Sequence, residues 1–146
     1  GPLFCTEGDN LLTRLLAELR TENPEPFCID EYLAPTSSAA IARVLVAILK
    51  QLSCDIEPWG VYHYCAADIT NRYDFAEVVL AIVNQYDKRY TDISLQSAER
   101  RRERTYRVFN CEKIRNTFGI KQMPWKTELV STLRQLYQIE KNASGE

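Results

Sequence analysis

The sequence has few of the residues, and none of the motifs, on which most enzyme sites depend. Its 146 residues include one histidine, one methionine and five glycines, and they contain no Walker loop, GxGxxG, GxSxG or HExxH motif. No stretch approaches the roughly 18 consecutive apolar residues of a membrane span, and the first residues do not resemble a signal peptide. We therefore expect a cytoplasmic protein without a membrane partner.

Paired cysteines and a strong net charge are missing as well. The cysteines form no CxxC pair and are odd in number, so neither a disulfide framework nor a metal site is expected. They are Cys5, Cys28, Cys54, Cys65 and Cys111. With 18 basic and 20 acidic residues the net charge is −2, which excludes the basic surface of a general nucleic-acid binder. We expect no nucleic-acid partner.

The chain offers little material for a catalytic site. His63 is the single histidine and lies in an aromatic, strand-like run, where a structural or pocket-lining role is favoured over that of a general base. A Cys65–His63 dyad is conceivable because residues i and i+2 share a strand face, and Cys111 is a second candidate thiol, but no orienting acid accompanies them. Asp30 and Glu31 would point to opposite faces of a strand. We expect no catalytic residue in this chain.

Helical and strand-like segments alternate, which predicts a mixed α/β fold rich in helices, with a few short strands. Helices are expected after Asp9 or Asn10, after the hydroxyls of residues 36–38, after Thr70 or Asn71, after Asn110, and from Trp125 onward. Short strands are expected at 27–32, 61–65 and 92–95. Residues 1–140 would form one domain, and residues 141–146 a frayed tail.

Helical spacing also predicts which side chains face the core. In the second helix they are Ile41, Val44, Leu45, Ile48 and Leu52; in the third, Phe75, Val78, Val79, Ile82 and Tyr86; in the last, Leu129, Leu133, Leu136 and Ile139.

Residues 99–107 form an arginine-rich segment. It holds five arginines and one tyrosine, Tyr106. Guanidinium groups match phosphate oxygens in pairs and a tyrosine ring can stack on a base or ribose, so a nucleotide-diphosphate site is one interpretation. A solvated loop compensated by Glu99 and Glu103 is the other, and composition alone leaves both open.

Six landmarks occur in the order and spacing of a known family. They are Gly1-Pro2-Leu3-Phe4 with Gly8-Asp9-Asn10-Leu11, Asp30-Glu31-Tyr32-Leu33-Ala34-Pro35-Thr36, Gly60-Val61-Tyr62-His63, Tyr73-Asp74-Phe75-Ala76, Asn110-Cys111-Glu112-Lys113-Ile114, and Phe118-Gly119-Ile120 with Pro124-Trp125. Together they resemble the C-terminal, substrate-binding half of the dTDP-4-dehydrorhamnose reductase family, an extended branch of the short-chain dehydrogenases/reductases. The resemblance covers the chain from Gly1 to about Leu136.

The resemblance implies a domain that binds a nucleotide-diphosphate sugar. Taken with the arginine segment, it predicts a substrate site made of Arg102, Arg104, Tyr106, Arg107, Tyr32, Pro35, Thr36 and His63. In the family the dinucleotide loop and the catalytic Tyr-x-x-x-Lys lie upstream of the position that corresponds to Gly1. We therefore expect this chain to hold no cofactor and to be inactive alone. A complete family member would use NADPH or NADH bound by a separate Rossmann domain.

The chain departs from the family pattern in the loop that begins at Asp30. Glu31 replaces the family's Gln and Leu33 replaces its Gly, which changes the charge and the backbone freedom of the loop. The later R-P-x-x-S segment aligns near residues 103–107 and lacks the Pro. The alternative function is therefore a non-catalytic regulatory or protein-interaction domain of the same fold, with a protein partner or as a homodimer.

Overall fold

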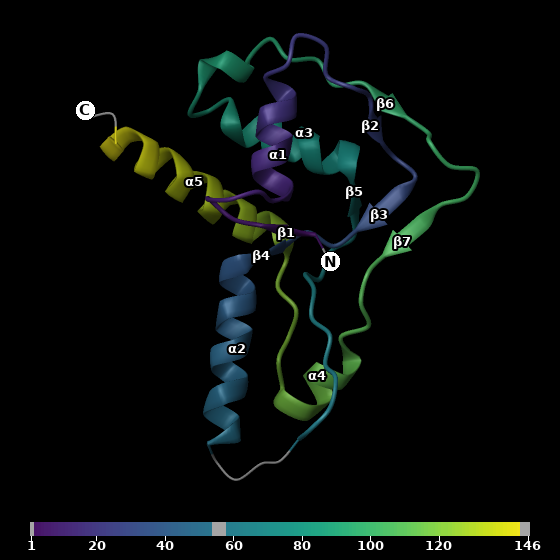
Figure 1. Cartoon of the computed structure of the whole chain (residues 1–146), viewed down its shortest axis with the longest axis vertical. Helices are drawn as coiled ribbons and strands as arrows, with labels where there is room; N and C mark the ends of the chain where they lie inside the picture. The colour runs from purple at the N-terminus through teal and green to yellow at the C-terminus, as the bar shows by residue number, and fades with distance from the viewer. Residues whose placement is uncertain (1, 54–57, 144–146) are drawn as a thin grey trace.

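The elements of the fold are short strands and five α-helices, seen in a computed structural model that describes residues 2–53 and 58–143 (Figure 1). Within those residues the helices are α1 (Leu11–Leu19), α2 (Ser38–Leu52), α3 (Arg72–Val83), α4 (Glu112–Phe118) and α5 (Trp125–Ala143), with a 3-10 turn at Lys88–Tyr90. The strands are β1 (Leu3–Phe4), β2 (Phe27–Cys28), β3 (Glu31–Leu33), β4 (Thr36–Ser37), β5 (Thr70–Asn71), β6 (Ser97–Ala98) and β7 (Thr105–Arg107). The predicted mixed α/β class with short strands is confirmed.

The strands form three small sheets. β1 pairs with β4 and β2 pairs with β6, both in parallel. In the third sheet β3 is central, antiparallel to β5 and parallel to β7. Strands that are far apart in the sequence therefore lie side by side, as β2 and β6 do in Figure 1.

Side-chain caps begin the first three helices where the sequence predicts them. The Asn10 carboxamide accepts the N–H groups of Leu12 and Thr13 at the start of α1. Ser37 and Asn71 cap α2 and α3 in the same way. Because a side-chain oxygen satisfies backbone donors that have no partner inside the helix, these residues fix where each helix starts.

Apolar side chains form two separate clusters. The larger lies where α1, α3 and α5 meet and includes Phe4, Leu12, Phe75, Trp125 and Leu133. The smaller joins α2, α4 and the segment before β5. In Figure 1, α2 and α4 form a lobe that extends away from α1, α3 and α5.

Two predicted strands are wrong. Residues 61–65 are not in a sheet, because no described strand pairs with them. The segment beside the end of this run bonds to it through a side chain, that of Gln122. The Gln122 amide donates to the carbonyls of Cys65 and Ala66, each at 3.0 Å. Residues 92–95 are not a strand either, since Ile93 and Leu95 pack against the larger cluster and pairing with β2 begins two residues later, in β6. The predicted strand at 27–32 is two strands, β2 and β3.

Two predicted core positions are exposed. Leu45 on α2 is 55% exposed, and with Val46 and Leu49 it makes an apolar stripe on the outer side of that helix. Helical spacing identifies an apolar face but not what covers it. Tyr86 is 43% exposed because α3 ends before it, at Val83, and its ring stacks on Tyr137 instead.

The end of the chain bears on two further predictions. α5 continues to Ala143, so residues 141–143 extend the helix rather than leave it. Residues 144–146, Cys54 and the side chain of Ile139 lie outside the described part. Across residues 2–53 and 58–143, no helix is both long and apolar enough to cross a bilayer.

Candidate functional site

The central sheet divides the predicted site residues between its two faces. Leu33 on β3 is in register with Arg107 on β7, and Tyr32 is in register with Tyr106. Since side chains alternate along a strand, Leu33 and Arg107 share one face, and Tyr32 and Tyr106 share the other. The two tyrosine rings stack with their centroids 5.1 Å apart and an interplanar angle of 16°.

A large hollow of about 730 Å³ lies on the Leu33 face. Its lining combines apolar, aromatic and charged side chains: Pro2, Leu11, Glu31, Leu33, Arg72, Tyr106, Arg107, Val108 and Phe109. The Arg107 Nε lies 2.6 Å from the Glu31 Oε1, so this pair is an ion pair within the hollow. We call this space the large hollow.

A smaller, polar hollow of about 390 Å³ lies on the Tyr32 face. Arg101, Arg102 and Arg104 line it together with Glu99, Glu103 and other polar residues. The Arg104 guanidinium lies over the Tyr32 ring, 5.8 Å from its centroid. Within the described part of the chain, Arg102 and Arg104 form no ion pair with a carboxylate. The structure thus separates Arg102 and Arg104 from Arg107.

Asp30 holds the arginine segment against the sheet. Its buried carboxylate accepts the backbone N–H groups of Arg100 and Arg101 and the Cys28 thiol. The Cys28 thiol and then these two N–H groups hold the pKa of Asp30 below its ordinary value, because each donor stabilises the ionised form. The adjacent Glu31 turns toward Arg107, so the two carboxylates separate as predicted.

Three predicted residues lie outside both hollows. Pro35 and Thr36 are buried, and the Thr36 hydroxyl donates to Ala34 O and accepts the N–H of Ala66. His63 is exposed, and its ring stacks on Phe109 with a centroid separation of 5.0 Å. His63 therefore touches a wall of the large hollow, whereas Pro35 and Thr36 support the fold behind it.

The side chains of Cys65 and Cys111 are in contact. Their Sγ atoms are 3.7 Å apart and both residues are buried. Burial raises the pKa of Cys111 to about 11, which disfavours the thiolate that a nucleophile needs. No group of three or more metal-ligating residues occurs in the described ranges.

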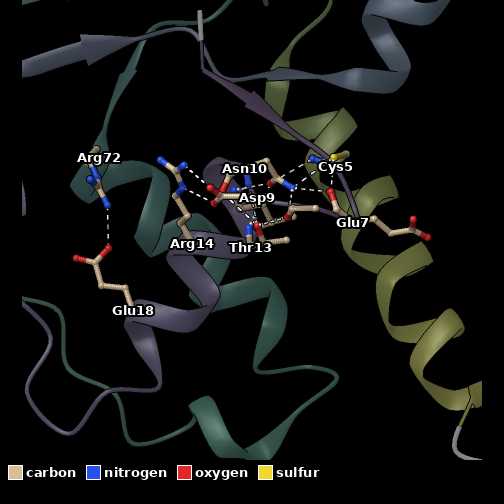
Figure 2. A network of polar contacts seen from close by, with 10 residues as sticks. Cys5, Glu7, Asp9, Asn10, Thr13, Arg14, Glu18 and Arg72 are labelled. Carbon is tan, nitrogen blue, oxygen red and sulfur yellow. Dashed lines mark hydrogen bonds and ion pairs between the residues drawn. The ribbon is translucent and has the colours of Figure 1, made fainter.

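Sequence reasoning missed Arg72, the first residue of α3. It lines the large hollow and also a neighbouring hollow of about 390 Å³ beside Arg14, and Pro2 and Leu11 line both as well. Figure 2 shows the Arg72 side chain next to Glu18 of α1, with an N···O distance of 2.8 Å. No motif marks this residue; only the register between β3 and β5 brings it to the hollow.

The described residues do not fit a dinucleotide cofactor. Such a cofactor needs a glycine-rich turn that leads into a helix with free N–H groups. The glycine closest to that arrangement is Gly8, ahead of α1, but the Asn10 side chain already occupies the first N–H groups of that helix. A phosphate therefore has no cradle there.

The chain is similar to one protein family and to several solved structures. The family described as the RmlD substrate binding domain matches residues 1–138. No curated protein matches the chain. Among solved structures, the dTDP-4-dehydrorhamnose reductase of Clostridium acetobutylicum superposes on 93% of this chain with a TM-score of 0.75 at 19% identity.

Two other solved reductases share the fold. The enzyme from Bacillus anthracis, solved in complex with NADP, covers 91% of this chain with a TM-score of 0.70 and 17% identity. The enzyme from Yersinia enterocolitica covers 93% with a TM-score of 0.62 and 13% identity. This chain spans 46% to 47% of the length of these three reductases. Because the family match covers nearly its whole length, the chain belongs to the RmlD substrate-binding domain family.

Proposed function

We propose that the chain binds a nucleotide-diphosphate sugar in the large hollow, as the substrate-binding part of a dTDP-4-dehydrorhamnose reductase-like protein. The observation that carries the proposal is the lining of that hollow. Its volume of about 730 Å³ is in the range of small-molecule sites, and it combines apolar walls with two guanidinium groups and exposed aromatic rings. A polar, anionic ligand with a flat base needs these groups.

The predicted residues would then contact different parts of the ligand. Arg107 faces the phosphates, and Phe109, 40% exposed, offers a ring face for the base, whereas the Tyr106 ring stacks on Tyr32 on the other side of the sheet. His63 supports Phe109 in the wall. Arg102 and Arg104 lie across the tyrosine pair, so a ligand reaches them only around the outer strand β7. Their contribution is expected to be smaller than that of Arg107.

Calorimetry with dTDP-glucose and UDP-glucose tests this proposal. We expect one of the two to raise the melting temperature of the chain by several degrees, since a ligand that binds only the folded state stabilises it. Arg107→Ala should remove most of that rise, and Arg102→Ala and Arg104→Ala less. Arg115→Ala is the matched control, because Arg115 is also ion-paired but lies on α4. Absence of heat and of any melting shift with both nucleotides would rule the proposal out.

We further propose that the chain works joined to a nucleotide-binding half that supplies NADPH, with NADH as the alternative. β1 and β4 form a parallel pair of only two residues each, and the second edge of β1 is free within the described residues. Parallel strands are normally buried in larger sheets with helices over their faces. The exposed stripe of α2, which follows β4 directly, fits such a covering helix.

The size of the intact protein in its source cells tests this second proposal. An antibody raised against this chain should detect one band of roughly twice the 16.9 kDa of the chain. A band at 16.9 kDa that co-purifies with a stoichiometric protein partner, insensitive to Arg102→Ala and Arg104→Ala, would favour the regulatory alternative instead.

A further inference from the structure

Arg72 and Arg107 lie at opposite edges of one sheet face. Leu33 on the central strand is paired with Thr70 on β5 and with Arg107 on β7. Arg72 follows β5 directly as the first residue of α3, one position past the Tyr32–Asn71 pair, and it lines the same hollow as Leu33 and Arg107. Two strand spacings amount to roughly 10 Å, so long side chains from both edges can converge above β3. The large hollow occupies this space.

A helix cap and two side-chain contacts hold Arg72 in place. The N-cap Asn71 fixes the start of its helix, the Glu18 carboxylate accepts from one terminal nitrogen at 2.8 Å, and the guanidinium carbon lies 5.9 Å from the centroid of the Phe27 ring. A guanidinium carries five N–H donors, and Glu18 engages one of its nitrogens. Its side chain is 41% exposed. Arg72 is thus pre-oriented with donors left for a ligand.

Glu31 is an anion in the same hollow as these two cations, and it pairs with Arg107 and, at 3.7 Å, with Arg101. Its side chain is 18% exposed and its Oε1 lies 2.6 Å from the Arg107 Nε. A carboxylate in this position keeps Arg107 oriented, but it also repels any phosphate that enters the hollow. The same residue therefore orders the site and lowers its affinity for an anion.

We propose that Arg72 and Arg107 clamp two adjacent phosphates from opposite edges of the sheet, and that Glu31 limits how tightly they hold them. The inference rests on the proposed function, because it assigns the diphosphate of that ligand to particular groups. It places the phosphates on the Leu33 face and gives the leading role to a residue outside the arginine segment.

Titration with inorganic pyrophosphate tests the clamp without a nucleotide or a sugar. Each charged hydrogen bond is worth about 1.5–3 kcal/mol, so Arg72→Ala should weaken binding roughly 10- to 100-fold. Arg107→Ala should do the same, and Glu31→Gln should tighten binding several-fold. Arg115→Ala, on α4, should leave the affinity unchanged.

Glu18→Gln separates a binding role of Arg72 from a structural one. The substitution breaks the ion pair with α1 but keeps the guanidinium. If Arg72 acts only through Glu18, both variants will weaken pyrophosphate binding equally, and the clamp is excluded. If wild type binds dTDP-glucose or UDP-glucose but Arg72→Ala binds pyrophosphate as well as wild type does, the clamp is wrong while the proposed function stands. If pyrophosphate binding depends on Arg72 but neither nucleotide-sugar binds, the two arginines do bind phosphates and the proposed function is wrong.

Discussion

Asp30 shows how a single carboxylate positions a segment that follows it by seventy residues. Its oxygens accept the N–H groups of Arg100 and Arg101, which are otherwise part of a loop without a sheet partner. The sequence suggested only that Asp30 and Glu31 face apart. That Asp30 meets the arginine segment depends on the pairing of β3 with β7 and of β2 with β6, which no local pattern reveals.

Asp30→Ala should release the arginine segment. We expect amide hydrogen exchange at Arg100 and Arg101 to become much faster, because their N–H groups lose their acceptor. Asp30→Asn keeps one oxygen and should show a smaller change. Amides of α5 serve as an internal reference and should not change. Equal exchange in wild type and Asp30→Ala would mean that another group orders the segment.

Glu128 makes the stability of the chain depend on pH. The Arg43 guanidinium, and also the Ser37 hydroxyl, donate to its carboxylate and hold its pKa below the ordinary 4.5. A pKa that is lower in the folded state gives stability that is present above 4.5 and lost as the pH falls through the folded value. Only 14% of the Glu128 side chain is exposed.

We expect Glu128→Gln to lower the free energy of unfolding by on the order of 1 kcal/mol at pH 7, discounted for the exposed Arg43. The difference from wild type should shrink as the pH falls below 4.5. Urea unfolding at pH 7 and pH 3.5 measures both. Glu112→Gln, which removes the partner of the exposed Arg115 on α4, provides the comparison. A gap between wild type and Glu128→Gln that stays constant with pH would contradict the assignment.

At the scale of the element, the starts and ends of helices were predictable because they depend on neighbours in the sequence. Gly119 ends α4 with a φ of 67°, the left-handed conformation expected of a glycine directly after a helix. The caps Asn10, Ser37 and Asn71 follow the same logic. The segment 61–65 was mispredicted, because strand-like composition says nothing about whether a partner strand lies alongside.

Gly119→Ala should destabilise the chain although the new methyl group meets no atom within 4 Å. A left-handed alanine costs about 1–2 kcal/mol, partly offset by a less flexible unfolded chain. We expect a drop in melting temperature of roughly 2–4 °C. Gly119→Asn should cost less, because asparagine tolerates this conformation. If the alanine and asparagine variants melt together, the backbone argument does not hold.

At the scale of the whole molecule, the α2 stripe is the clearest feature without a covering group in the described part of the chain. Leu45, Val46 and Leu49 are 50% to 64% exposed on one helix face. Periodicity marked Leu45 as core, and this prediction is wrong, because helical spacing identifies an apolar face but not what covers it. The nucleotide-binding half proposed above would be a neighbour that covers this face.

Leu49→Lys should therefore leave the fold intact and change how the chain associates. We expect a melting temperature within about 1 °C of wild type, because a surface substitution changes stability by only about 0.5 kcal/mol. Light scattering at high concentration should fall, since a large exposed apolar side chain is removed. Val44→Lys, five residues earlier on the buried side of the same helix, should unfold the chain. A large loss of stability in Leu49→Lys would place this stripe in a core.

The candidate site was only partly predictable, because it is assembled from segments that are far apart in the sequence. Arg107 and Tyr106 were found because charge and aromatic character are visible in one segment, and both line the large hollow. Arg72 was not, because it reaches the hollow through pairing between strands almost forty residues apart. Pro35 and Thr36 were included in the predicted site because of the family motif, and the structure places them in the interior.

The three sheets also set the order in which this chain can fold. β2 pairs with β6 and β3 pairs with β7 across about seventy residues of chain. Contacts so distant in sequence form slowly, because the intervening chain loses entropy before the pairing stabilises it. During synthesis α1, α2 and α3 can form while the chain grows, but the large hollow cannot exist until β7 has left the ribosome.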